Sequence, residues 1–214
     1  MEAVKEFSVP MALVDFIPVI LFAIAAVMLQ RDLYNKMSKG AFALFAAGTI
    51  DVICSGALKA LYKLLYAAGV CDFVRLNDMF FPVQSIGFLL AGIGVVAMLV
   101  HKQGETLPAV AAAPAVFSGT FVFVGLMVAG LGCMDFGLVA IAKRLKKPAA
   151  IVLLCVSFVM CLGMGYLSTK NFEKASLNWI AEGVNVVGQL CFLLAAVLMR
   201  KAGLKELKLE KETR

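Results

Sequence analysis

The sequence predicts an all-α membrane protein, a polytopic bundle of seven transmembrane helices. Its 214 residues are 62% hydrophobic and 16% charged, with a mean hydropathy of +0.94, which is too apolar for a soluble domain of this size. A helix needs roughly 20 apolar residues to cross a bilayer. Five runs reach that length or exceed it: 11–30, 40–66, 78–100, 148–167 and 177–199. The distribution of positive charge, considered below, sets the number of spans.

The first apolar run is expected to be a retained helix. The segment before it carries Glu2, Glu6 and Lys5, and the basic residues come after the run. A secretory signal peptide has its positive charge first. The connectors between the runs are short, which leaves no room for a soluble catalytic or ligand-binding domain.

The segment 105–143 is too long for one membrane span. As one helix it would be about 58 Å long at 1.5 Å per residue, nearly twice the roughly 30 Å hydrocarbon thickness. The most polar break within it is at Ser118 to Thr120. Cutting there gives a short Ala/Pro-rich helix, 105–117, followed by a full span, 120–143. The alternative is a six-span chain in which 105–117 lies at the membrane interface.

Positive charge favours seven spans. With Lys59 and Lys63 set aside because they lie inside a helix, the seven-span arrangement places 14 basic residues on one side and four on the other, whereas six spans give 12 and six. Cytoplasmic loops carry the excess of lysine and arginine. We therefore expect a multi-pass protein of the cell membrane, with its amino terminus outside and its carboxyl terminus in the cytoplasm.

One bundle, residues 1–203, and a charged cytoplasmic tail, 204–214, make up the expected organisation. The net charge of +6 comes from basic residues mostly at helix ends, where they meet lipid headgroups. The expected partners are therefore the lipid bilayer and a small polar solute, with no nucleic acid, and a homo-oligomer or a partner membrane subunit is an open alternative. No spacing typical of a metal site or of a cofactor motif occurs, so we expect neither.

Two three-helix repeats joined by the short fourth helix would account for seven spans. The second and sixth spans share Cys-x-Gly, at Cys54 and Cys161, and the third and seventh share an amide three residues before a glycine, at Gln84 and Asn185. This layout resembles the three-plus-one-plus-three arrangement of small sugar and vitamin carriers, although their Pro-Gln signature is missing. The resemblance is one of fold and assigns no function.

The last span carries a stripe of hydrogen-bonding side chains. Asn178, Glu182, Asn185 and Gln189 are spaced by four, three and four residues, which keeps them on one face of a helix. A carboxylate exposed to hydrocarbon is costly, so such stripes face the protein interior or a water-filled cavity. The alternative for Glu182 is a place at the helix start or among headgroups.

Counting depth from the outer helix ends places most of the intramembrane polar groups in the outer half. Lys59 and Glu182 come to similar depths, about 10 and 8 Å at 1.5 Å per residue. We therefore expect them to form an ion pair that lines a solute site, with Gln84, Asn178, Asn185 and Gln189 orienting the solute. In the alternative, Lys59 extends to the interface.

Three further carboxylates, Asp15, Asp51 and Asp135, are candidates for coupling to a proton or cation, because ionisable groups at membrane depth often serve this purpose. The alternative for Asp51 and Asp135 is a neutral carboxyl bonded to a neighbouring helix. Catalytic motifs are missing, so no catalytic residue is named. We expect a solute transporter with an outward-facing pocket; a membrane ligand sensor or partner-dependent subunit is the second hypothesis and an intramembrane enzyme the third.

Overall fold

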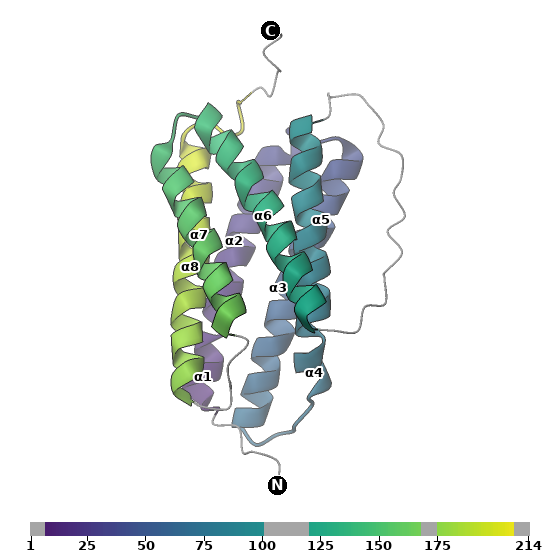
Figure 1. The fold of residues 1–214 in the computed structure, drawn as a ribbon, viewed down its shortest axis with the longest axis vertical. Coiled ribbons are helices and arrows are strands. Elements are labelled where there is room, and N and C mark those ends of the chain that lie inside the picture. The colour runs from purple at the N-terminus through teal and green to yellow at the C-terminus, as the bar shows by residue number, and fades with distance from the viewer. Residues whose placement is uncertain (1–6, 101–119, 168–174, 208–214) are drawn as a thin grey trace.

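The computed structural model describes residues 7–100, 120–167 and 175–207, and this part of the chain forms helices and no strands. Six helical segments are long and apolar enough to cross a membrane. They stand side by side in one bundle (Figure 1). The predicted all-α bundle of a multi-pass membrane protein is confirmed. The expected short helix, 105–117, lies outside the described residues.

The helices follow the predicted spans closely. The first span consists of α1 and α2, and a 3₁₀ turn, η1, follows it; the third consists of α4 and α5; each of the others is one helix. Their bounds are α1 Val9–Val14, α2 Phe16–Leu33, η1 Tyr34–Lys36, α3 Lys39–Ala67, α4 Arg75–Asp78, α5 Phe80–Val100, α6 Thr120–Arg144, α7 Pro148–Leu167 and α8 Ala175–Lys201.

Two spans are interrupted three residues before a proline. The break between α1 and α2 is at Asp15, ahead of Pro18, and the break between α4 and α5 is at Met79, ahead of Pro82. Proline has no amide hydrogen for the carbonyl four residues earlier, and its ring crowds that carbonyl. Both breaks lie at the same end of the bundle (Figure 1), and the first one places Asp15 at a turn.

Helix α5 packs tightly between α3 and α6 because glycines let the backbones approach. A Cβ at Gly94 would lie 2.7 Å from the Ala41 carbonyl oxygen in α3, and a Cβ at Gly130 in α6 would lie 2.6 Å from the Leu89 Cα. Real Cβ atoms essentially never come so close to another heavy atom. These three helices therefore form one closely packed layer.

Helices α5 and α6 run in the same direction. Gly130 meets Phe88 and Leu89 in α5, and Gly137, two turns later in α6, meets Val95 and Leu99. Contacts that advance together along both helices indicate parallel packing. The end of α5 and the start of α6 consequently lie at opposite ends of the bundle (Figure 1).

The chain after α8 turns back onto the bundle. Gly203 adopts a φ of 85°, which suits glycine at a helix end, and Leu204 is fully buried. The Lys36 ammonium donates hydrogen bonds to the carbonyl oxygens of Lys205 and Leu207 at 2.9 and 2.7 Å. The described start of the expected tail is therefore attached to the helices, and residues 208–214 lie outside the described part.

Candidate functional site

A cavity of about 320 Å³ lies among the helices and is partly open. Every one of the six spans contributes to its wall, α6 by Met127 alone. A volume of 300 to 1,000 Å³, an apolar lining and a few placed polar groups are typical of small-molecule sites. The cavity therefore has the size and the location of a ligand site within a membrane bundle.

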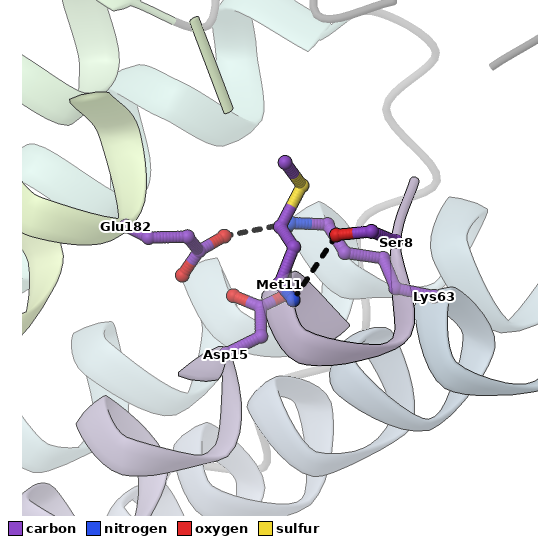
Figure 2. Close-up of polar contacts among 5 residues, drawn as sticks. All are labelled: Ser8, Met11, Asp15, Lys63 and Glu182. Carbon is purple, nitrogen blue, oxygen red and sulfur yellow. Dashed lines mark hydrogen bonds and ion pairs between the residues drawn. The ribbon is translucent and has the colours of Figure 1, made fainter. Parts of the chain in front are cut away.

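A cluster of three charged side chains lies at the end of the cavity where α2 and α8 begin. The Lys63 ammonium is 2.7 Å from Glu182 Oε1 and 2.8 Å from Asp15 Oδ2. All three side chains are buried, and Figure 2 shows the two carboxylates converging on the lysine. The cluster joins α3, α8 and the turn between α1 and α2. Asp15 and Lys63 line the cavity, whereas Glu182 is buried without lining it.

Lys59, one turn before Lys63 in α3, also lines the cavity. Its ammonium lies over the Phe80 ring, 4.1 Å from the ring centroid, a cation–π contact. No carboxylate in the described part of the chain comes within 4 Å of it. Lys59, unlike Lys63, is therefore a cavity-lining cation whose N–H groups can donate hydrogen bonds to a ligand.

Four carboxamides add neutral polar groups to the wall: Gln84 from α5, and Asn178, Asn185 and Gln189 from α8. The Oε1 atom of Gln84 is buried and has no hydrogen-bond donor among the described residues. An unsatisfied buried acceptor costs about 1–3 kcal/mol. A bound solute or water that donates to Gln84 would recover this cost.

Three aromatic rings pack together at the end of the cavity opposite the charged cluster, where Phe22 and Phe88 line the wall. Phe22 of α2 packs edge-on against Phe88 of α5, with centroids 5.9 Å apart, and stacks on Phe192 of α8 at 5.6 Å. All three rings are at most 4% exposed. We call Phe22, Phe88 and Phe192 the aromatic floor. Phe22 follows Asp15 by seven residues, so the floor lies about 10 Å further along the bundle.

Comparisons with known proteins add no assignment. Family models, curated proteins and solved structures gave no match to this chain. The chemistry of the cavity is therefore the basis for the inferences that follow. A metal site is not among its features: in residues 7–100, 120–167 and 175–207, no three His, Cys, Asp or Glu side chains come together.

The cavity brings together five of the six residues expected to bind a solute, namely Lys59, Gln84, Asn178, Asn185 and Gln189. The sixth, Glu182, is buried beside them. The stripe on the last span therefore faces inward, as its polarity indicates. That these residues bind a solute stays a prediction.

The ion pair differs from the expected one, because Glu182 pairs with Lys63 and not with Lys59. Counting depth along each helix placed Lys59 level with Glu182. A lysine side chain, however, extends over about one helical turn, so the backbone depth of Lys63 does not give the position of its ammonium. The signal for Lys63 was its spacing of four residues from Lys59, which puts both on one face of α3.

The three coupling candidates lie in different surroundings. Asp15 belongs to the charged cluster. Asp51 is half-buried and packs beside Gly87 of α5 without lining the cavity. Asp135 of α6 is 1% exposed, and neither of its carboxyl oxygens has a donor in the described part of the protein. Their role in coupling stays a prediction.

The sequence reasoning also missed the aromatic floor. Its three rings belong to three separate apolar runs, where phenylalanine is also typical of lipid-facing and core positions. Spacing within α5 was the available signal, since Phe80, Gln84 and Phe88 recur every four residues and thus share a face. All three line the cavity.

Proposed function

We propose that the protein is a multi-pass carrier of the cell membrane that binds a small polar or charged solute in this cavity. The observation that carries the proposal is the position of polar groups from three spans, Lys59, Gln84 and Asn185, in one cavity closed by the aromatic floor. A site near the middle of the membrane, closed on one side, is typical of alternating access.

A channel fits the cavity less well than a carrier does. A channel needs a continuous polar path, and here the buried rings of the aromatic floor lie beyond the polar part of the cavity. An enzyme would need a reactive pair, whereas Asp15 and Glu182 are both held by Lys63. A membrane ligand sensor would use the same cavity, and the experiment below distinguishes it.

Seven crossings, with the amino terminus outside, form part of the proposal. The parallel packing of α5 and α6 supports it: a chain that leaves one end of the bundle and re-enters at the other has to cross the membrane between them. The excess of positive charge at one set of helix ends supports the orientation. The cavity then opens to the outside, above the aromatic floor.

The proposal also includes two repeats, α2–α3–α5 and α6–α7–α8. Gly87 of α5 packs on α3 at Asp51 and Val52, and Gly188, 101 positions later, packs on α7 at Ser157 and Met160. Cys54 in α3 and Cys161 in α7 differ by 107 positions. Subtracting this offset from the positions of Ser157 and Met160 gives positions within two residues of Asp51 and Val52. Corresponding contacts support a pseudo-two-fold axis along the membrane normal, as parallel repeats require.

Binding and exchange measurements test the carrier function. The purified protein would be screened for thermal stabilisation by amino acids, organic acids, nucleosides and vitamins, and each ligand found would then be tested for counterflow in proteoliposomes. The test variant is Gln189→Leu, which removes an amide from the cavity wall. Leu190→Ala is the control, because Leu190 is the next residue in α8 and is exposed on the outside of the bundle.

A carrier is expected to bind a ligand, to exchange it across the liposome membrane, and to lose both properties in Gln189→Leu while Leu190→Ala keeps them. Saturable binding without exchange would favour the sensor. If no member of the four solute classes binds, or if Gln189→Leu binds as the unmodified protein does, the cavity is not the site.

A further inference from the structure

We propose that the solute is a small organic anion with an apolar body, whose carboxylate binds the Lys59 ammonium and whose body extends toward Phe22. This inference rests on the proposed function of the same cavity and adds the chemical class of the solute.

The charges around the cavity favour an anion. Two carboxylates and two lysines meet there, but Asp15 and Glu182 both contact Lys63. These carboxylates are poor partners for a cationic solute, because the Lys63 ammonium already contacts both of them and would repel a second cation, and because Glu182 does not line the cavity. The remaining ionic group is the Lys59 ammonium.

Lys59 is well placed to receive a carboxylate. It lines the cavity, and its ammonium is held over the Phe80 ring at 4.1 Å. A lysine ammonium has three donors, and the ring face uses its charge without accepting a strong hydrogen bond. Because charge-assisted hydrogen bonds are about twice as strong as neutral ones, a carboxylate is the best additional partner for this group.

The polarity of the cavity changes along its length. On one face of α5, Phe80 lies beside the Lys59 ammonium, Gln84 follows one turn later, and Phe88 belongs to the aromatic floor. At about 1.5 Å per residue, the eight-residue step from Phe80 to Phe88 spans about 12 Å. A matching solute has its charge at one end, a hydrogen-bonding group near the middle, and an apolar end.

The floor and Met160 suit an apolar end. Phe22 and Phe88 offer ring faces and edges, and Met160 lines the cavity beside Gly188 of α8, one turn before Phe192. Methionine is flexible and polarisable, and it packs well against aromatic groups. A volume of about 320 Å³ equals that of about eleven liquid waters at roughly 30 Å³ each, which accommodates a phenyl ring with a short acidic chain.

The test uses three probes of similar size and different charge: 3-phenylpropionate, 3-phenylpropionamide and 3-phenylpropylamine. Their dissociation constants would be measured calorimetrically at neutral pH with the full-length protein in detergent. The variants are Lys59→Met, which keeps the chain length and removes the charge, and Lys59→Arg, which keeps the charge. Lys143→Met is the matched control, because Lys143 lies exposed in the last turn of α6, away from the cavity.

The anion is expected to bind at least tenfold more tightly than the amide and the amine. Lys59→Met should weaken anion binding at least tenfold, Lys59→Arg should restore most of it, and Lys143→Met should leave it unchanged. Equal or tighter binding of the amide or the amine overturns the anion assignment. So does the lack of saturable anion binding, or an affinity that does not change in Lys59→Met.

These outcomes separate this inference from the proposed function. If the amine or the amide is the probe that binds, and Gln189→Leu abolishes its binding, the cavity is a solute site and only the charge of the solute is wrong. If the solute screen and the three probes all give no binding in the unmodified protein, both proposals fail.

Discussion

The Lys63 ammonium lies 2.7 Å from Glu182 Oε1, across 119 residues of sequence, and 2.8 Å from Asp15 Oδ2. A single cation thus connects the turn of the first span with the second and last spans. Each partner is buried, so the two carboxylates depend on this lysine to offset the cost of leaving water. The charged cluster therefore fixes the helices at the end of the cavity.

Replacing Lys63 by Met is expected to lower the free energy of unfolding by about 3–5 kcal/mol, because it leaves two buried carboxylates without their cation. The measurement is reversible unfolding in mixed detergent and SDS micelles. Lys143→Met, at an exposed position, should change the stability by no more than about 0.5 kcal/mol.

A triple variant separates lost charge pairing from a general loss of packing. Adding Asp15→Asn and Glu182→Gln to Lys63→Met removes the buried negative charges, so stability should return in part. If Lys63→Met unfolds like the unmodified protein, or if the triple variant is less stable than Lys63→Met, the ion pairs do not hold these helices together.

The helices and the inward face of the last span were predictable from the sequence because both follow from local patterns. An apolar run of about 20 residues becomes a membrane helix wherever it lies in the chain. Asn178 and Gln189 share a face through helical geometry alone. No knowledge of neighbouring helices is needed for either inference.

The partners across the cavity were not predictable in the same way. Whether Glu182 meets Lys59 or Lys63 depends on how far α3 and α8 are shifted along each other and on the lysine rotamer. The contact between Phe22 and Phe192 likewise depends on the close approach of two distant segments. Such contacts are tertiary. Because phenylalanine and lysine occur at many positions of the chain, the residue type alone does not identify which two residues meet.

The aromatic floor should contribute strongly to stability. Phe22→Ala removes a ring that contacts both Phe88 and Phe192. Because alanine does not fill the space of the ring, a void is left between the helices. A loss of about 3–5 kcal/mol in the free energy of unfolding is expected, measured in the same mixed micelles.

Phe136→Ala is the control for this change. Phe136 is 57% exposed on α6 and contacts a single ring, that of Phe158, so its loss should cost less than about 1.5 kcal/mol. Comparable losses for Phe22→Ala and Phe136→Ala would show that the floor is not a packed element.

The close contact between α5 and α6 predicts a large effect from one added methyl group. Gly130→Ala would bring a Cβ to 2.5 Å from the Phe88 carbonyl carbon and 2.6 Å from the Leu89 Cα. These are backbone atoms, so the helices have to move apart. A loss of about 1–3 kcal/mol or more in the free energy of unfolding is expected.

Gly125→Ala is the matched control in the same helix, because a Cβ there meets no atom of the described residues within 4 Å. Alanine is the better helix former by about 1 kcal/mol, so this variant should be as stable as the unmodified protein or slightly more stable. The close-contact explanation would not survive if both glycine variants were equally stable.

The number of crossings can be tested at two described loops. Cys71 lies between α3 and α4, and Lys147 lies between α6 and α7. With seven crossings these positions are on opposite sides of the membrane, Cys71 outside and Lys147 in the cytoplasm; with six crossings both are on the same side. A variant that keeps only Cys71, and a cysteine-free variant carrying Lys147→Cys, would be treated with a membrane-impermeant maleimide in intact cells.

Because α5 and α6 are parallel, we expect labelling at Cys71 in intact cells and at position 147 only after permeabilisation. Labelling of both positions, or of neither, in intact cells would instead indicate six crossings.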